Sequence, residues 1–572
     1  MNLPDARRGW LARHGGWWAP LLITLTLVAV GWPGLDGDWG RDDYFQLALA
    51  RMIGSPWPLF GSDHYPVPGS VFRPLGFASM WLDTWLFGGA YRGHAACDLA
   101  LHVGVALALF GLLRRAGVDR PAAVLATLVF ALHPVALGPA QWWSARFDVL
   151  AAACILGALQ AGLAWCVRPR GTSLLLALLA AFAAMASKEI GLIAPALLAL
   201  LWLHCAWREP AQRVRALWAA AAAGLCAALF LLWRWRVLGT VGSGLLGGRA
   251  LVDALAGGIG VWLHEAPGYF SFAARLASWQ RVLLALALFG LAATCGLLAW
   301  RRRGSPTAIG RAVPAARFAL LCCGLGLLLL PAVLQAPVAM LNGAPLRADD
   351  SAVEAAMQSR LYYLGMAGLA VLLGALLAAC RGRLRHLAGA ATLLALVALG
   401  SAGQRAVREF AQRSVDNARS AHAAVAAVAA LPLVTTPCRI VFVGAPQPAE
   451  WGGFVSMDGI VKALAADRAA IARCWIFEDG RPTWFHLQDA TARPADALPW
   501  TPLVVDGQAV PWPRVGDLRY AYLSPPPRFD LRTLVGTHFL RWRDGRFEDI
   551  GVEVAAGRVQ VQPWHAEPTR HN

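Results

Sequence analysis

The stretch WAPLLITLTLVAVGWPGLDGDWGRDDYF, Trp18–Phe45, joins an apolar run of membrane-spanning length to a polar loop that carries two adjacent acids. Such a run predicts a transmembrane helix, and the basic segment 7–13 before it predicts a cytoplasmic N-terminus. No convincing cleavage site follows, so we expect the run to remain as the first span. Asp42 and Asp43 then lie at its outer mouth, where carboxylates are costly and tend to be kept for function.

The composition is typical of a polytopic membrane protein. Of the 572 residues 58% are hydrophobic and 15% charged, and the mean hydropathy is +0.50. The formal charge of +17 comes largely from arginines in short loops between apolar runs, which indicates membrane orientation rather than a nucleic-acid groove. About eleven spans are predicted, near 17–33, 93–113, 119–137, 147–167, 171–187, 189–207, 214–236, 281–300, 317–337, 360–380 and 386–402.

The arginines predict which loops lie inside. With the N-terminus in the cytoplasm, short basic loops such as 301–303 and 381–385 fall inside, and longer loops of mixed charge fall outside. The outer loops include a long first loop, 34–92, and a second long loop, 237–280. We therefore expect residues 1–402 to form a multi-pass domain in a bacterial inner membrane.

After residue 402 the composition changes. An Ala-rich helical pattern over 403–431 predicts a connecting helix, and short β-type runs broken by Pro and Gly over 432–572 predict a strand-rich α+β soluble domain. An odd number of spans places this domain outside, in the periplasm. Cys438 and Cys474 are its only cysteines, so we expect a disulfide between them in that oxidising compartment.

Asp42 and Asp43 have two explanations. An acid in the first outer loop could accept a proton from an incoming hydroxyl. Alternatively, one aspartate caps the helix that is predicted to run from here to about Met52, since Asp is a favoured N-cap residue. One helix needs only one cap, so this alternative explains Asp42 better than Asp43.

Basic residues from distant parts of the chain are all predicted on the outer side: Arg73, Arg146, Lys188 and Arg360. Gathered near one carboxylate they would form an anion site beside a general base, and the arginine fork suits phosphate oxygens. The alternative is that each reaches the membrane interface or pairs locally, for example Arg146 with Asp148 and Lys188 with Glu189.

His94, Asp98 and His102 recur at four-residue spacing on one face of the predicted second span. These residue types could bind a metal, but a buried polar ladder to a neighbouring helix is the better explanation. A weaker cation site would use side chains of the first outer loop: Asp42, Asp43 and His64. The chain lacks a nucleotide-binding signature. We expect no cofactor, and dependence on a divalent cation stays open.

Six short motifs follow one another within residues 10–402: Asp42-Asp43; Phe72-Arg73-Pro74-Leu75; Gly93-His94, Asp98 and Leu101-His102; His133-Pro134 with Trp142, Arg146 and Asp148; Ser187-Lys188-Glu189; and Ser359-Arg360-Leu361-Tyr362-Tyr363. Their order resembles the multispanning glycosyltransferases of the GT-C fold, in particular protein O-mannosyltransferase relatives and bacterial counterparts of the transmembrane-and-TPR mannosyltransferases. The TPR repeats of many relatives are replaced here by the strand-rich tail.

The resemblance implies a sugar donor on a polyprenyl phosphate, an outward-facing active site and no nucleotide. It implies that Asp43, or Asp42, is the base on the acceptor and that Arg360 is the leading ligand of the lipid phosphate. Lys188, Arg146 and Arg73 would support Arg360. Further supporting residues would be Glu189, Asp148, His133, His94, Asp98 and His102. The expected partners are the donor, membrane lipids, and an envelope glycan, lipid or protein as acceptor.

Two other functions share some of these features. A transporter or flippase for a lipid-linked glycan also keeps acids and arginines inside a helical bundle. Its charges should lie near the bilayer midplane, whereas these are predicted at the outer ends of spans. A catalytically inactive scaffold for envelope assembly would tolerate the loss of both Asp42 and Asp43.

Overall fold

The computed structural model describes residues 17–64, 71–241, 276–303, 315–342, 354, 358–432, 438–446, 456–466, 471, 474–479, 486–489, 503–505, 508–510, 514–521 and 537–561. Most of the predicted second outer loop, 237–280, falls outside these residues. The chain divides into two compact units. The first comprises Met1–Asp36, Ala95–Leu231 and Gly248–Ala411, and the second comprises Gly37–His94, Leu232–Gly247 and Gln412–Asn572. The predicted boundary at residue 402 followed composition alone, and the contacts group the first outer loop with the C-terminal residues.

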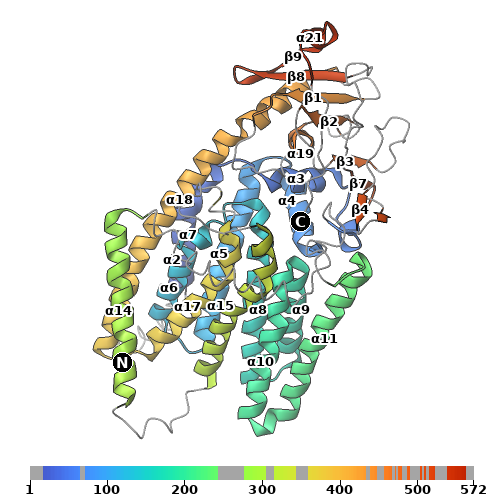
Figure 1. Cartoon of the computed structure of the whole chain (residues 1–572). Helices are drawn as coiled ribbons and strands as arrows, with labels where there is room; N and C mark the ends of the chain where they lie inside the picture. Colours follow the sequence, from blue (N-terminus) through green and yellow to red (C-terminus); the bar gives the residue numbers. More distant parts are fainter. Residues whose placement is uncertain are drawn as a thin grey trace, which may run out of the picture. The chain divides into compact units, whose positions relative to one another are not determined.

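The first unit is a bundle of long helices (Figure 1). Its helices are α2 (Trp18–Gly31), α6 (Arg120–Ala131), α7 (Pro134–Leu137), α8 (Arg146–Val167), α9 (Gly171–Ser187), α10 (Ile193–Arg208), α14 (Ser278–Arg303), α15 (Ala315–Asn342) and α17 (Tyr363–Ala379). Three more helices have residues in both units: α5 (Tyr91–Arg115), α11 (Arg213–Leu238) and α18 (Arg383–Ala429).

Each of the eleven predicted apolar segments coincides with a helix. Among the described residues, eight helices are long and apolar enough to cross a membrane. The other three predicted spans correspond to two shorter apolar helices, Arg120–Ala131 and Gly171–Ser187, and to a short apolar stretch, Ala319–Pro331, within α15. The predicted last span and connecting helix form one uninterrupted helix, α18, whose 47 residues give a length of about 70 Å. The protein is a polytopic α-helical membrane protein.

Small residues let the helices of the bundle approach closely. A Cβ atom added at Gly368 on α17 would lie 2.6 Å from the backbone nitrogen of Leu328 and 2.7 Å from the carbonyl oxygen of Gly324, both on α15. Backbone contact of this kind replaces the hydrophobic driving force that is missing between helices in lipid. Around it the core is filled by Ala, Leu and Val side chains.

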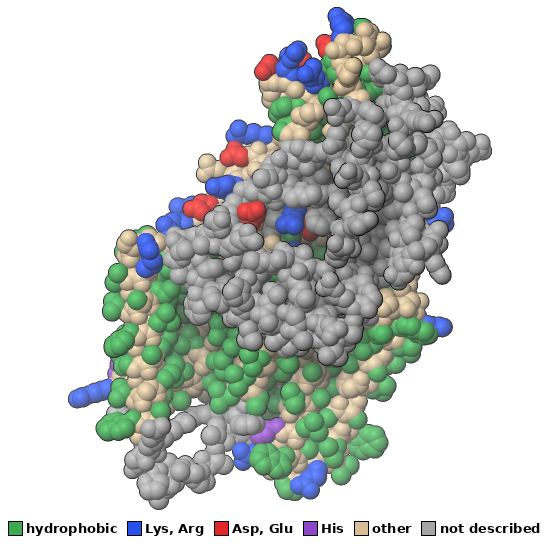
Figure 2. All heavy atoms as spheres, viewed as in Figure 1, with side chains coloured by type: hydrophobic (Ala, Val, Ile, Leu, Met, Phe, Trp, Pro, Cys, Tyr) green, Lys and Arg blue, Asp and Glu red, His purple; other side chains and the backbone are tan. Residues whose placement is uncertain are grey.

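The outward faces of the bundle are apolar. Leu175 on α9, Leu225 on α11 and Phe289 on α14 are 57%, 60% and 75% exposed. Figure 2 shows hydrophobic side chains over the outer surface of these helices, with lysine and arginine near their ends. Such a large apolar surface suits contact with lipid.

An ion pair joins two loops that were both predicted to be cytoplasmic. Arg385, near the start of α18, lies 2.9 Å from a carboxylate oxygen of Asp119. Asp119 also caps α6 by accepting a hydrogen bond from the backbone N–H of Ala122. The structure therefore brings these two loops to the same end of the bundle, as the arginine pattern predicted.

The second unit contains two helices of the first outer loop, α3 (Asp42–Met52) and α4 (Pro74–Phe87), and most of the C-terminal residues. The main sheet has the order β2-β1-β8-β9, with β1 parallel to both β2 and β8 and antiparallel pairing of β8 with β9. Its strands are β1 (Arg439–Val443), β2 (Trp475–Glu478), β8 (Thr537–Arg543) and β9 (Arg546–Asp549). Asp544 and Gly545 make the β8–β9 turn with positive φ angles of 50° and 83°, which a tight hairpin requires.

Smaller elements complete the C-terminal region. They are α19 (Met457–Leu464), α21 (Gly551–Ala555), β3 (His486–Asp489), β4 (Leu503–Val505), β5 (Gln508–Val510), β6 (Arg514–Val515) and β7 (Leu518–Ala521). β3, β7 and β6 form one antiparallel sheet, and β4 pairs with β5. The predicted strand-rich α+β character is confirmed.

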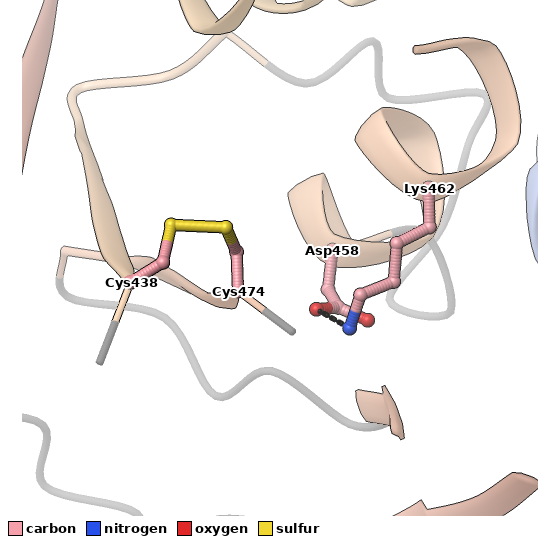
Figure 3. The surroundings of a disulfide bond; sticks show 4 residues. All are labelled: Cys438, Asp458, Lys462 and Cys474. Atoms are coloured by element: carbon pink, nitrogen blue, oxygen red, sulfur yellow. Dashed lines mark hydrogen bonds and ion pairs between the residues drawn. A yellow bond between two sulfur atoms is a disulfide. The ribbon is translucent and has the colours of Figure 1, made fainter. Parts of the chain in front are cut away.

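The predicted disulfide is present. Cys438 and Cys474 are bonded, and they directly precede β1 and β2 (Figure 3). Since β1 and β2 are parallel and α19 lies between them in sequence, the disulfide joins the two strands at the ends where they begin. Close by, Asp458 and Lys462 of α19 form a buried ion pair with Nζ 2.6 Å from Oδ1.

Candidate functional site

The two adjacent acids open α3. The helix begins at Asp42, its N-cap residue is Arg41, and no side chain makes a capping hydrogen bond. The alternative that Asp42 or Asp43 caps this helix is therefore wrong. Both carboxylates instead lie in the first turn, where the positive end of the helix dipole stabilises anions.

The two acids differ in how they are held. Asp43 is 2% exposed, and its Oδ2 accepts a hydrogen bond of 3.2 Å from the backbone N–H of Gly40. The side chain of Asp42 is 34% exposed and lies 3.8 Å from Nε of Arg41. Asp43 therefore has a fixed orientation, whereas Asp42 is hydrated.

The turn before α3 is strained and rigid. Arg41 has φ 50° and ψ −122°, a conformation that costs a residue other than glycine roughly 1–3 kcal/mol. The hydroxyl of Tyr44 donates a hydrogen bond of 3.0 Å to the carbonyl of Trp39. Burial, together with the charges of Asp38 and Asp43, raises the pKa of the Tyr44 hydroxyl well above its usual range, so the hydroxyl stays a donor. Strain of this kind clusters at functional sites.

Two buried ion pairs lie in the first unit. Nε of Arg146 is 2.6 Å from Oδ1 of Asp98, and the side chains are 1% and 3% exposed. Nζ of Lys188 is 2.6 Å from both carboxylate oxygens of Asp148. These pairs differ from the local pairs of the alternative explanation, since Arg146 and Asp148 have partners on other segments of the chain. Glu189, the partner of Lys188 in that alternative, opens the 3-10 turn η4 (Glu189–Leu192) and is partly exposed.

Arg360 opens the 3-10 turn η9 (Arg360–Tyr362) that leads into α17. Its guanidinium carbon lies 4.8 Å from the ring centroid of Trp142, and that of Arg146 lies 5.8 Å from the ring of Trp143. Trp142 is 1% exposed. The aromatic faces attract these cations and hold them in defined positions.

We use the name polar cluster for this set of first-unit residues: Asp98, Trp142, Arg146, Asp148, Lys188 and Arg360. The residues come from the N-terminal half of α5, the segment that enters α8, the end of α9 and the start of α17. Three basic side chains and two carboxylates leave a formal charge of +1. Three of the four predicted phosphate ligands thus belong to the first unit, and each has a defined neighbour: Asp98 for Arg146, Asp148 for Lys188 and Trp142 for Arg360.

His102 and Tyr363 form a second polar contact in the bundle. The Tyr363 hydroxyl donates to Nδ1 of His102 at 2.8 Å, and Nε2 of His102 donates to the carbonyl of Ala131 at 3.0 Å. His133 has a local role, because its Nδ1 accepts the backbone N–H of Val135 and caps α7.

The spaced triad of the second span does not form a metal site. His94 donates from Nε2 to the carbonyl of Gly88 at 3.0 Å, and its Nδ1 lies 4.0 Å from Asp83. Asp98 pairs with Arg146 and His102 with Tyr363, so the polar-ladder explanation holds for each residue. Over the part of the chain that the structure describes, no group of three or more His, Cys, Asp or Glu side chains could hold a metal ion.

The weaker cation site is also not formed. Nε2 of His64 contacts the carbonyl of Leu59, and Nδ1 accepts the backbone N–H of Arg73 at 3.1 Å. Both ring nitrogens are therefore engaged by the backbone of their own loop. Arg73 belongs to the second unit and ends the segment before α4, while the other three predicted phosphate ligands belong to the first unit.

Two contributions were missed by sequence reasoning. Trp142 belongs to one of the six motifs but had no predicted role, and Arg51 was not predicted to be a functional residue. Trp142 could have been suspected, because aromatic residues beside arginines often stack with them. Arg51 gave no comparable signal, because its partners are backbone carbonyls more than 400 residues away.

No family model and no curated protein matches this chain. Solved structures do. An oligosaccharyltransferase of Archaeoglobus fulgidus tethered to an acceptor peptide is 13% identical with a TM-score of 0.46, over 81% of this chain and 65% of that one. ArnT of Cupriavidus metallidurans bound to undecaprenyl phosphate is 12% identical with a TM-score of 0.45, over 89% and 98%. The arabinosyltransferase EmbB of Mycobacterium smegmatis is 17% identical with a TM-score of 0.35, over 63% and 30%.

All three are GT-C glycosyltransferases. This is the class that the order of motifs in the sequence resembles. At identities of 12–17% and TM-scores below 0.5, the likenesses define neither substrate nor chemistry for this chain. Its function has to be argued from its own residues.

Proposed function

We propose that this protein is a glycosyltransferase that moves a sugar from a polyprenyl-phosphate donor to an envelope glycan, lipid or protein. The polar cluster is the observation that carries the proposal. Charged side chains in membrane helices are costly and are kept for function, and here the basic members of two ion pairs and a stacked arginine lie at helix ends in the first unit. The formal surplus of one positive charge in the polar cluster suits a phosphate that is bound at a membrane.

Arg360 is the leading phosphate ligand in this proposal. Its side chain is held over Trp142, and its planar fork can bind two phosphate oxygens at once. Arg146 and Lys188 support it with positive charge, while Asp98 and Asp148 fix their positions. In a site shielded from water, stabilising the charge of the leaving group is a large part of catalysis.

Asp43 is the general base. It accepts the proton of an acceptor hydroxyl, and the acceptor oxygen bonds to the anomeric carbon of the sugar. The bond from that carbon to the phosphate oxygen breaks, and the polyprenyl phosphate leaves with the electron pair. Asp43 suits the role better than Asp42, because it is buried and the hydrogen bond from Gly40 fixes the orientation of its carboxylate.

The reaction is placed on the outer side of a bacterial inner membrane, with the N-terminus in the cytoplasm and the C-terminal region in the periplasm. The distribution of arginines supports this orientation. So does the Cys438–Cys474 disulfide, since disulfides persist in oxidising compartments.

A transport function receives less support from the structure. Arg146 opens α8, Lys188 follows α9, and Arg360 precedes α17, so the basic side chains of the polar cluster lie at the ends of helices. Charges that line a transport path are expected near the middle of the bilayer. An inactive scaffold would have no need for a fixed Asp43.

The test is transfer of radiolabelled sugar from a panel of polyprenyl-phosphate sugars, in membranes that contain wild type or Asp43→Asn, with and without chelator. Label in an envelope fraction with wild type alone supports both the class and the base. Loss of transfer with chelator would show that a divalent cation takes part. No transfer from any donor by correctly inserted protein would contradict the proposal and favour a flippase or a scaffold.

A further inference from the structure

Arg51 ties the helix that carries Asp43 to the C-terminal region. Its guanidinium donates from Nη1 to the carbonyl of Ala463 and from Nη2 to the carbonyl of Ala465, the latter at 3.0 Å. Ala463 lies in the last turn of α19, and Ala465 is its C-cap residue. The arginine is 9% exposed and belongs to the second unit with both of its partners.

This contact uses the particular geometry of arginine. The last carbonyls of a helix have no partner within the helix and form the negative end of its dipole. A planar fork can donate to two of them at once, which a lysine ammonium on a flexible stem does less well. A Cβ at Gly89 would lie 3.4 Å from Nη1, so the guanidinium is also enclosed by the turn that follows α4.

α19 is itself firmly held. Ser456 caps its start by accepting the backbone N–H of Gly459, and the carboxylate of Glu478 on β2 accepts the backbone N–H of Met457 at 2.7 Å. The buried pair of Asp458 and Lys462 fixes its inner face. α19 therefore moves with the main sheet and not independently of it.

α3 packs directly on this helix. A Cβ at Gly459 would lie 3.9 Å from the backbone nitrogen and 4.0 Å from Cα of Phe45, two residues after Asp43. Eight residues separate Asp43 from Arg51, which is about 12 Å along one short helix. A shift of α19 at either contact must therefore be transmitted to the first turn of α3.

We propose that Arg51 is a positioning residue, through which the C-terminal region sets the place of the Asp43 carboxylate. The inference rests on the proposed role of Asp43 as base. It makes the C-terminal region part of the catalytic machinery rather than an appended domain. A misplacement of about 1 Å costs up to a hundredfold in rate, so the contact is large enough to govern turnover.

The test compares Arg51→Ala and Arg51→Lys with wild type and with Arg541→Gln, an exposed arginine on β8. Arg51→Ala should lower kcat roughly ten- to a hundredfold, with the donor KM within about twofold. The kcat of Arg51→Lys should lie between those of Arg51→Ala and wild type, and the kcat of Arg541→Gln should equal that of wild type. An unchanged kcat in Arg51→Ala overturns the inference. A raised donor KM with an unchanged kcat in Arg51→Ala would also overturn the inference.

A second-site rescue separates positioning from a loss of folding. Phe45→Cys with Gly459→Cys is the pair chosen for a disulfide between α3 and α19, because a Cβ at Gly459 would lie 4.0 Å from Cα of Phe45; formation of the cross-link is verified by mass spectrometry. In the Arg51→Ala background this cross-link should restore kcat to within about threefold of the cross-linked protein that retains Arg51. A cross-link that forms without restoring kcat contradicts positioning.

Amide hydrogen exchange in α3, measured in the same proteins, reports how firmly this helix is held and does not depend on sugar transfer. Arg51→Ala should exchange at least tenfold faster in α3, and the cross-link should reverse this. If wild type transfers no sugar, the proposed function fails, and exchange alone decides whether Arg51 holds α3. Unchanged exchange would overturn the inference in that case too.

Discussion

The guanidinium carbon of Arg360 lies 4.8 Å from the ring centroid of Trp142, so a cation that leads into α17 is held on the face of a buried indole next to α8. The indole supplies attraction without competing for the N–H donors of the arginine. Arg360 is thereby held in a defined position before a sugar donor binds.

Replacing Trp142 should weaken donor binding. Loss of a cation–π contact of about 0.5–2 kcal/mol corresponds to a donor KM raised roughly 2- to 30-fold in Trp142→Leu, and Trp142→Phe should lose less. Steady-state transfer measures this. The control is Trp202→Phe, a buried tryptophan on α10 outside the polar cluster. If the donor KM of Trp142→Leu equals that of Trp202→Phe, the contact of Arg360 with the Trp142 ring does not contribute to donor binding.

Substitution of the two adjacent acids should lower kcat to different extents. Asp43→Asn removes the proton acceptor and should lower kcat by roughly 10²–10⁴-fold, the usual contribution of general base catalysis. Asp42→Asn is the matched control, since it alters an exposed carboxylate one residue away and should change kcat less than about threefold. The reverse ranking in single-turnover measurements would move the base to Asp42.

Replacing one member of the Arg146–Asp98 pair should lower the stability of the protein. Replacing both members with apolar residues should lower sugar transfer but leave stability largely intact. Asp98→Asn leaves a buried guanidinium without its carboxylate, which costs about 3–5 kcal/mol. The double variant Asp98→Leu with Arg146→Met should regain most of this stability in thermal unfolding in detergent, yet transfer poorly. A stable Asp98→Asn protein, or a fully active double variant, would be inconsistent with the roles given to the pair.

The stability of the C-terminal region should rise with pH in alkaline buffer. Burial lowers the pKa of the Lys462 ammonium, opposed by the charge and hydrogen bond of Asp458. The folded state therefore releases its proton at a lower pH than the unfolded chain, whose lysine titrates at about 10.5. Below the pKa that Lys462 has in the folded protein, the free energy of unfolding carries the full destabilisation from the buried ammonium. As pH rises from that pKa towards 10.5, the folded protein loses this proton before the unfolded chain does, and the free energy of unfolding increases.

Urea unfolding followed by a probe in the C-terminal region, at several pH values above 8, measures this slope. The double variant Asp458→Leu with Lys462→Met removes both buried charges and should be flat over the same interval. A flat profile in wild type would mean that burial does not lower the pKa of Lys462.

Much of this architecture could be predicted from the sequence. Hydropathy finds helices because their apolar faces must meet lipid or one another, and all eleven predicted segments are helical. The predicted last span and connecting helix are one helix, because the composition changes at residue 402 while the local preference for helix continues through α18. The Cys438–Cys474 pairing followed from their being the only cysteines of their region.

The site was less predictable because pairing depends on distance in space. The alternative explanation paired Arg146 with Asp148, two residues away, but residues two apart on a helix do not face each other. Asp148 instead receives Lys188 and Arg146 receives Asp98. The N-cap explanation for the acids failed because Arg41 adopts a strained turn that a residue-based preference does not anticipate.

The contact between Arg51 and Ala463 joins residues that are 412 positions apart. At 5–20 residues per second, a ribosome needs roughly 20–80 seconds to add the intervening chain. Throughout that interval α3 has been made and its partner has not. If Asp43 is the base, a nascent or prematurely terminated chain that ends before α19 holds the acid without the partner that fixes it, so the enzyme would become active only after α19 has been made.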